Sequence, residues 1–144
     1  MSRESGPDDF DWVLAQSRCT SVLMFDALRT HVKEDVQRRN GVSGRNDDWT
    51  FEFDEDGDDF EVVRLRSDQR DSKVLALVRF ERNGRRIDVH GEDIDVEFTA
   101  IVTVDAAGLC RFVVGEVMYS EWEIRRMALE ALFFDEADDN GDDA

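Results

Sequence analysis

Short segments with the apolar pattern of β-strands follow one another from residue 49 to residue 118, and turn sequences separate them. In the first, Trp49, Phe51 and Phe53 alternate with polar residues, which is the period of a strand with one buried face. The other segments are 60–66, 73–82, the residues after Asn83-Gly84, 95–104 and 109–118. Strands in hairpin succession, with helical patterns only before and after them, favour one antiparallel meander over a parallel sheet.

The dipeptide Asn83-Gly84 is the clearest turn signal in the chain, because it is the preferred pair of a two-residue type I′ hairpin. Such a turn brings apolar residues opposite each other on one face of the two strands. The expected pairs are Arg82 with Arg85, Phe80 with Ile87, and Val78 with Val89.

Helical patterns flank the strands. Residues 8–39 predict one long helix, with Asp8 as N-cap and Asn40-Gly41 as a left-handed stop. Ser120 and Glu123 have the spacing of a capping box and predict a C-terminal helix that runs to about Phe134. The predicted fold is α+β: an N-terminal long helix, an antiparallel meander of about six strands, and a C-terminal helix packed on the sheet. We expect a single domain over 1–134 and an acidic disordered tail over 135–144.

The run from Val22 to Phe25 places four large apolar residues on about 300° of a helix. The long helix carries one apolar stripe through Trp12, Cys19 and Leu23 and a second, roughly opposite stripe, and one sheet face cannot receive both. Each such side chain left exposed to water would lose roughly 1.5–3 kcal/mol of the free energy that its burial contributes to stability. We therefore predict a homodimer or a stable complex with another protein; the alternative is a monomer that encloses the helix itself. The predicted protein-interaction residues are Leu23, Met24, Phe25, Leu28 and Val32.

The charge of the chain is strongly negative, with 35 acidic residues, 18 basic residues and a net charge of −17. This balance argues against nonspecific binding to nucleic acid or to an anionic membrane. Six of the acids fall in 54–61 and six in the tail 135–144. Arginine far exceeds lysine, a composition that fits either a high-salt habitat or a nucleotide bias.

Two cysteines, Cys19 and Cys110, lie in apolar runs. We interpret them as buried reduced thiols, with a disulfide as the alternative. No run approaches the about 20 apolar residues of a membrane span, and the first residues lack the order of a secretory signal. The predicted location is the cytoplasm.

Two acidic clusters contain residue types that bind metal ions. With Gly57 at position 6 of a calcium loop, position 12 is Val63, so the bidentate ligand is missing. Asp88 and His90 share a strand face near Glu92 and could hold a transition metal, but a solvated strand face is the favoured interpretation. No metal and no cofactor is predicted.

Catalytic patterns are weak. The chain has neither a nucleophile elbow nor a glycine-rich phosphate loop, so no catalytic residue is predicted. Asp26 could be a functional acid in an apolar pocket, but a local pair with Arg29 or Thr30 is favoured. His31 is interpreted as the surface partner of Asp35.

Four arginines surround the predicted hairpin and form a basic tip on an acidic protein. They could contact an anion or an acidic partner through forked guanidinium bonds, or simply keep the hairpin soluble. The residues are Arg79, Arg82, Arg85 and Arg86.

These features favour a noncatalytic protein-interaction module, chaperone-like or adaptor-like, whose partner is another protein or a second copy of the chain. One alternative is an acidic mimic of nucleic acid that inhibits a DNA- or RNA-binding protein. Another is a small-ligand-binding or enzymatic domain, with a pocket between the long helix and the sheet lined by Trp12, Phe25, Phe51 and Phe98. A small ligand, a nucleic acid and a membrane are not expected as partners.

Overall fold

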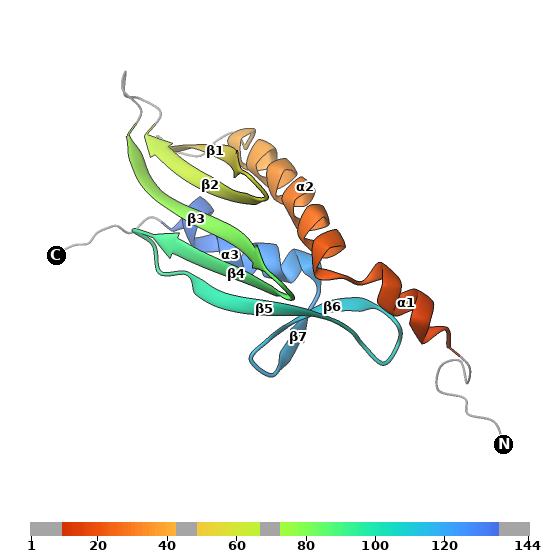
Figure 1. Cartoon of the computed structure of the whole chain (residues 1–144). Coiled ribbons are helices and arrows are strands. Elements are labelled where there is room, and N and C mark those ends of the chain that lie inside the picture. Colours follow the sequence, from red (N-terminus) through yellow and green to blue (C-terminus); the bar gives the residue numbers. More distant parts are fainter. Residues whose placement is uncertain (1–9, 43–48, 67–72, 136–144) are drawn as a thin grey trace.

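The computed structural model describes residues 10–42, 49–66 and 73–135. In this part of the chain two helices precede a seven-stranded sheet and a third helix follows it, so the fold is α+β as predicted (Figure 1). The helices are α1 (Trp12–Arg18), α2 (Ser21–Asn40) and α3 (Glu121–Phe134). The strands are β1 (Trp49–Asp56), β2 (Asp59–Arg66), β3 (Val74–Asn83), β4 (Arg86–Glu92), β5 (Glu97–Val104), β6 (Cys110–Val114) and β7 (Val117–Tyr119). Each strand pairs antiparallel with the next, which confirms the predicted meander.

Helices α2 and α3 cover the same face of this sheet, which we call the inner face. Phe25 of α2 packs on Phe60 with ring centroids 5.0 Å apart, and Phe133 of α3 packs on Phe51 at 5.0 Å. Phe60 in turn stacks on Phe80 of β3 at 4.7 Å. In the described residues no helix covers the opposite face, which we call the outer face. One sheet face therefore carries the whole helical layer, and the core lies between them.

The long helix predicted over 8–39 is wrong, because the chain leaves the helical conformation at Cys19 and Thr20. Thr20 is extended, with φ −113° and ψ 158°, and its hydroxyl accepts the N–H of Leu23 at 3.1 Å. A threonine that caps a new helix competes with continuation of the preceding one. The N-cap of α1 is Asp11, whose carboxylate accepts the N–H of Leu14 at 3.0 Å. The predicted cap Asp8 lies outside the described residues.

The left-handed stop predicted at Asn40-Gly41 is also wrong, since Gly41 is right-handed with φ −87°. Asn40 has a different role. Its side-chain amide donates to the carbonyl of Phe51 at 2.8 Å and accepts the Phe51 N–H at 2.9 Å. These two bonds occupy backbone groups on the free edge of β1, which would otherwise be open to another strand.

The Asn83-Gly84 hairpin forms with a different register from the predicted one. Asn83 pairs with Arg86, so the two turn residues are Gly84 and Arg85. Gly84 has φ +65° at the first turn position, which is where a type II′ turn requires glycine. Phe80 consequently pairs with Val89 instead of Ile87. Because the shift is two residues, every side chain keeps its predicted face.

The segment predicted as one strand over 109–118 is two strands. Gly115 has φ +64° and starts a turn between β6 and β7, in which Val114 pairs with Val117. The sheet therefore has seven strands where the sequence predicted about six.

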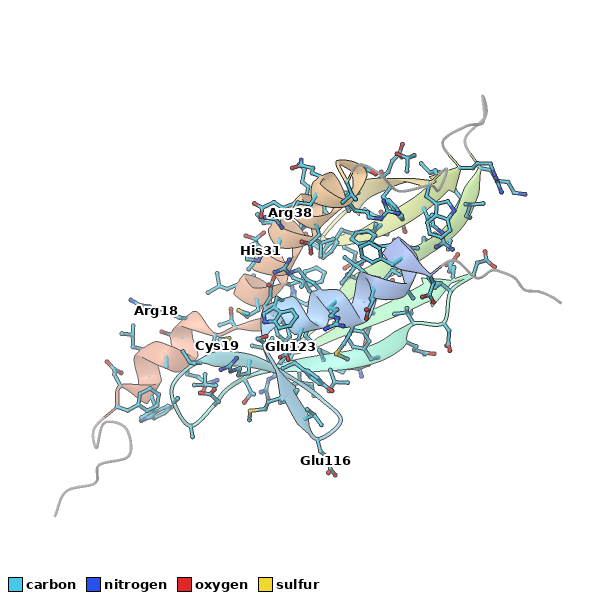
Figure 2. All side chains as sticks on the ribbon, turned by 180° about the vertical axis from the view of Figure 1, so that it is seen from behind. Arg18, Cys19, His31, Arg38, Glu116 and Glu123 are labelled. Carbon is cyan, nitrogen blue, oxygen red and sulfur yellow. A yellow bond between two sulfur atoms is a disulfide. The ribbon has the colours of Figure 1, made fainter. Side chains whose placement is uncertain are left out.

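Cys19 and Cys110 form a disulfide, so the prediction of reduced thiols is wrong. The bond joins the α1–α2 junction to the start of β6, and Figure 2 shows Cys19 at that junction. The two residues are 91 positions apart in the chain, and only the return of the meander brings their Cα atoms to 5.4 Å.

Three further findings concern the cap of α3, membrane-spanning helices and the predicted tail. The capping box of α3 is confirmed, because Glu123 accepts the N–H of Ser120 at 2.8 Å and its hydroxyl at 3.0 Å. Within the described residues no helix is both long and apolar enough to cross a membrane. The predicted tail lies outside the described residues from 136 onward, and the predicted single domain stays a prediction.

Acid is expected to destabilise this fold through two carboxylates. Asp105 accepts the N–H of Leu109 at 2.9 Å and the Arg111 Nε–H at 3.0 Å, and these bonds lower the pKa of Asp105 below its ordinary 3.8. The N–H and hydroxyl of Ser120 likewise lower the pKa of Glu123 below 4.5. The unfolded chain binds protons first, so both contributions are complete above the ordinary pKa values and disappear as the pH falls through the native ones.

We therefore expect the urea midpoint to fall steeply from pH 5 to pH 2, and less steeply in an Asp105→Asn/Glu123→Gln variant. Glu116→Gln, a change at the exposed β6–β7 turn, is the control and should keep the wild-type slope. Equal slopes in all three proteins would contradict the assignment.

Candidate functional site

Helices α2 and α3 lie side by side and run in the same direction across the inner face (Figure 2). Three contacts join them in the same order along both helices. His31 Nδ1 lies 2.8 Å from a Glu121 carboxylate oxygen, Asp35 contacts Arg125, and the Arg39 Nε–H donates to the carbonyl of Phe133 at 2.9 Å. The contacts span eight positions of α2 and twelve of α3, about two and three turns, and their order shows that the two helices run in the same direction.

An ion-pair network joins the C-terminal half of α2 to the first turns of α3. Arg125 donates from Nη1 to both carboxylate oxygens of Asp35, at 2.8 and 2.7 Å, and from Nε to Glu121 at 2.9 Å. Burial by itself would lower the pKa of Arg125, but the bond to Asp35 and the charge of Glu121 outweigh it and raise the pKa. Arg38 adds a third bond to Asp35, at 3.2 Å. The network holds the two helices at a fixed separation.

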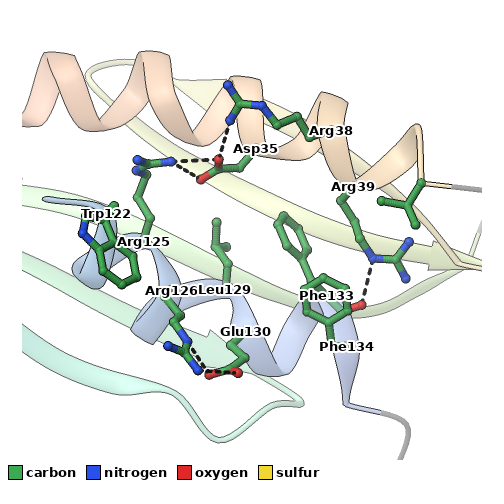
Figure 3. A pocket seen from close by; sticks show the side chains of 11 residues that line it. Asp35, Arg38, Arg39, Trp122, Arg125, Arg126, Leu129, Glu130, Phe133 and Phe134 are labelled. Atoms are coloured by element: carbon green, nitrogen blue, oxygen red, sulfur yellow. Dashed lines mark hydrogen bonds and ion pairs between the residues drawn. The ribbon is translucent and has the colours of Figure 1, made fainter.

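Beside this network the two helices leave a groove of about 430 Å³, shown in Figure 3. Leu129 and Phe133 are buried and form its floor. Trp122 and Phe134 stand near its two ends and remain 55% and 46% exposed. Large aromatic side chains left in water beside an apolar floor are typical of protein contact sites. We call this feature the α2–α3 groove.

Arginine dominates the charged lining of the α2–α3 groove. Four arginines and two carboxylates line it: Arg38, Arg39, Arg125, Arg126, Asp35 and Glu130. The lining is thus net positive on a chain whose net charge is −17. Among the arginines, Arg38 and Arg126 are exposed, with 70% and 63% of their side chains accessible; Glu130 is 56% accessible and pairs with Arg126 at 3.4 Å. Arg38 and Arg126 are therefore the guanidinium groups of the lining that are most accessible to an acidic side chain of a partner.

Two buried arginines fix the end of α3 that carries Phe134. Besides the Arg39 bond to Phe133, Nη1 of Arg64 donates to the carbonyl of Leu132 at 2.9 Å. The Arg39 guanidinium also lies 5.3 Å from the ring centroid of Phe134. Cations at a helix C-terminus satisfy its free carbonyls and oppose its dipole. Arg39 therefore holds both the helix end and the aromatic side chain at this end of the groove.

Arg39→Met is expected to lower the free energy of unfolding by about 1–3 kcal/mol, because a buried carbonyl loses its donor. The adjacent exposed residue gives a matched control: Arg38→Met should change stability by about 0.5 kcal/mol or less. Urea titration followed by far-UV circular dichroism measures both. Equal effects of the two substitutions would contradict the role given to Arg39.

Most of the apolar residues predicted to contact a partner belong to the chain's own core. Phe25, Leu28 and Val32 are buried under α2, so they are not available to a partner. Leu23 is exposed and Met24 is partly buried. For these two residues the interaction stays a prediction, and they lie outside the lining of the α2–α3 groove.

The four arginines predicted as one basic tip do not form one. Arg79 lies on the outer face and is bonded to Glu81 at 2.7 Å, Asp56 at 2.9 Å and Glu61 at 3.2 Å. These bonds, that of Glu81 first, raise the pKa of Arg79 well above its ordinary value. The others stay at the β3–β4 hairpin: Arg82 donates to the carbonyl of Gly84, Arg86 pairs with Asp88, and Arg85 is exposed.

Other predicted contacts have mixed outcomes. The pair of Asp26 with Arg29 is confirmed at 2.9 Å. The pair of His31 with Asp35 is wrong, because His31 meets Glu121 and Asp35 meets Arg125.

The remaining candidate sites are occupied by structural contacts. Asp88 bonds Thr99 at 2.8 Å and Asn83 at 2.6 Å, and Nε2 of His90 lies 3.7 Å from Glu81. Across the described ranges no group of three or more His, Cys, Asp or Glu side chains is placed to hold a metal ion.

The prediction of a pocket between the long helix and the sheet is wrong. Phe25 and Phe51 are closed inside the core, whereas Trp12 is 64% exposed on α1. The four residues therefore do not line one cavity.

The sequence of α3 contains a signal for the α2–α3 groove that was not among the predicted site residues. The core stripe of α3 runs through Ile124, Ala128 and Leu132, and Trp122 and Phe134 lie off that stripe. Large aromatic residues outside the buried stripe of an amphipathic helix are candidates for contact with a partner.

No protein-family model, no curated protein and no solved structure matches this chain. The groove's function must therefore be argued from its own chemistry.

Proposed function

We propose that this protein is a noncatalytic interaction module that binds an amphipathic helix of another protein in the α2–α3 groove. The observation that carries the proposal is the pair of exposed aromatic residues, Trp122 and Phe134, near the two ends of an apolar floor. Aromatic and arginine side chains are the residue types that most often dominate the binding energy of protein interfaces. Both types line this groove.

The dimensions of the groove favour a helical partner. Trp122 and Phe134 are twelve positions apart on α3, which corresponds to about 18 Å along a helix axis. A partner helix of about twelve residues spans that length with three turns. Two parallel helices also present the ridges between which a third helix packs. Helix-in-groove recognition uses apolar anchors at i, i+3 or i+4, and i+7, which would lie on Leu129 and Phe133.

Charge specifies the flanks of the partner helix. Arg38 on α2 and Arg126 on α3 line the groove from its two helices and are largely exposed. Glutamate or aspartate beside the apolar stripe of the partner can bond these guanidinium groups through two parallel hydrogen bonds. The partner is therefore an amphipathic helix with an apolar stripe and acidic flanks.

A displayed library of 14-residue helical peptides, with fixed leucines in the stripe and random flanking positions, tests this proposal. Enrichment of Asp and Glu at the flanks, and binding that weakens as salt is raised from 0.05 to 0.5 M, are the expected results. Selection of basic flanks, or of no helical peptide at all, would contradict it.

A homodimer and a cytoplasmic location stay predictions. Light scattering over a concentration series tests the dimer. The disulfide bears on the location, because stable disulfides are typical of oxidising compartments and those in the cytosol are commonly redox-sensing. Alkylation of free thiols in intact cells, followed by mass spectrometry of Cys19 and Cys110, distinguishes the two environments.

One observation favours the acidic mimic as a second candidate function. The outer face carries nine carboxylates and three arginines among the described strands, spread over a folded surface as a mimic requires. The acids are Glu52, Asp54, Asp56, Asp59, Glu61, Glu81, Asp88, Glu92 and Glu97. If this face acts as a decoy, the protein should displace DNA from nonspecific DNA-binding proteins, and should still do so after deletion of 135–144. Loss of displacement on that deletion would assign the effect to the tail.

A further inference from the structure

We propose that the disulfide between Cys19 and Cys110 is a redox latch: it holds α1 against the sheet, and its reduction releases α1 while the rest of the domain stays folded.

Helix α1 has little else to hold it. None of its seven residues is buried, and Trp12, Val13 and Leu14 are all exposed. An isolated helix of this length is not stable in water. Apart from the disulfide, the Phe10 ring contacts the β5–β6 turn at Gly108. A Cβ placed on Gly108 would lie only 2.5 Å from that ring.

Helix α2 is anchored independently, so the release can stop at the junction. Phe25, Leu28 and Val32 are buried in the core. The side chain of Thr20, the residue before α2, caps the N-terminus of the helix. The hydroxyl of Ser21 also donates to the carbonyl of Gly84 at 2.8 Å. These contacts do not depend on the disulfide.

The bond can be reached from solvent. A pocket of about 290 Å³ is lined by both cysteines together with Phe10, Leu14 and Arg18 of the α1 segment. Cys110 is half-buried, whereas Cys19 is buried. A small dithiol therefore approaches Cys110 more readily than Cys19.

The chemistry is thiol–disulfide exchange with a dithiol reductant. A thiolate of the reductant attacks Sγ of Cys110, the bond between the two protein sulfurs breaks, and the sulfur of Cys19 leaves and takes up a proton. The second thiol of the reductant then attacks the mixed disulfide, forms its own disulfide and frees Cys110. Two electrons pass to the protein, which ends with two thiols.

Release of α1 changes the surface at the end of β5 and β6, the strands on which it lies. Val104 and Cys110, now packed against the core cluster, would lose their cover, and Trp12, Val13 and Leu14 would move freely. The reduced protein would therefore expose more apolar surface than the oxidised one.

Amide hydrogen exchange of the full chain, read by mass spectrometry with and without dithiothreitol, tests the latch. We expect residues 12–20 to exchange at least tenfold faster after reduction, at close to the rate of an unstructured peptide, and β3, β4 and α3 to stay at least about a hundredfold slower than such a peptide. A Cys19→Ala/Cys110→Ala variant should exchange like the reduced protein and should not respond to dithiothreitol.

Two results would overturn the proposal. One is equal exchange of α1 in the oxidised and reduced proteins. The other is loss of protection throughout the sheet together with α1, which would mean that reduction unfolds the whole domain. Both comparisons use the wild-type chain, so they hold even if the double variant does not fold.

Discussion

Replacing Cys19 and Cys110 by serine lowers the free energy of unfolding by about 4 kcal/mol, the largest effect we expect from a change outside the aromatic core. The disulfide joins residues 91 positions apart, and a cross-link over so long a loop removes much of the freedom of the unfolded chain. A domain of this size has a stability of order 10 kcal/mol, so the variant stays folded but with a much reduced margin.

Urea titration at fixed pH measures this loss, with the reduced wild-type protein as the control. The double variant and the reduced wild type should have the same midpoint, well below that of the oxidised protein. A loss of less than about 1 kcal/mol would show that the bond does not constrain the unfolded chain in the expected way.

Phe60→Ala is expected to cost about 3–5 kcal/mol. The Phe60 side chain is fully buried, and its ring lies between those of Phe25, Phe53 and Phe80, at centroid distances of 5.0, 5.5 and 4.7 Å. Its removal leaves a cavity at the point where α2 meets the sheet, which rigid neighbours fill only in part.

Phe134→Ala serves as the matched control for Phe60→Ala, because the same atoms are removed from a half-exposed ring near one end of the groove. It should cost about 1 kcal/mol or less. Denaturant unfolding compares the two variants. Similar losses in both would contradict the assignment of Phe60 to the centre of the core.

The strands and α3 could be predicted because their signals are local. Alternation at Trp49, Phe51 and Phe53 and the capping box at Ser120 depend only on neighbours in sequence, and each element formed within a few residues of its predicted bounds. The antiparallel meander followed from the short connections.

The errors have tertiary causes. Thr20 caps a new helix next to the disulfide, and no local sequence pattern predicts that disulfide. Asn40 does not form the predicted stop because its amide bonds the edge of β1. The predicted register of the β3–β4 hairpin was wrong by two residues, because Gly84 occupies the first turn position.

The candidate site was harder to predict, because an apolar run does not say which of its faces meets the core. Within α2 the stripe of Phe25, Leu28 and Val32 enters the core, whereas Leu23, on the other stripe, stays exposed. The α2–α3 groove requires Arg125 to pair with Asp35, a contact between residues 90 positions apart.

Two exposed tryptophans on different helices provide the most direct test of the proposed function. Trp122 stands in the α2–α3 groove and Trp12 stands on α1, far from its lining. The measurement is the affinity of a selected acidic-flanked helical peptide for Trp122→Ala, Trp12→Ala and the wild type, by fluorescence anisotropy of a labelled peptide. We predict at least a tenfold loss for Trp122→Ala and less than a twofold change for Trp12→Ala. Equal affinity of the two variants would contradict the account.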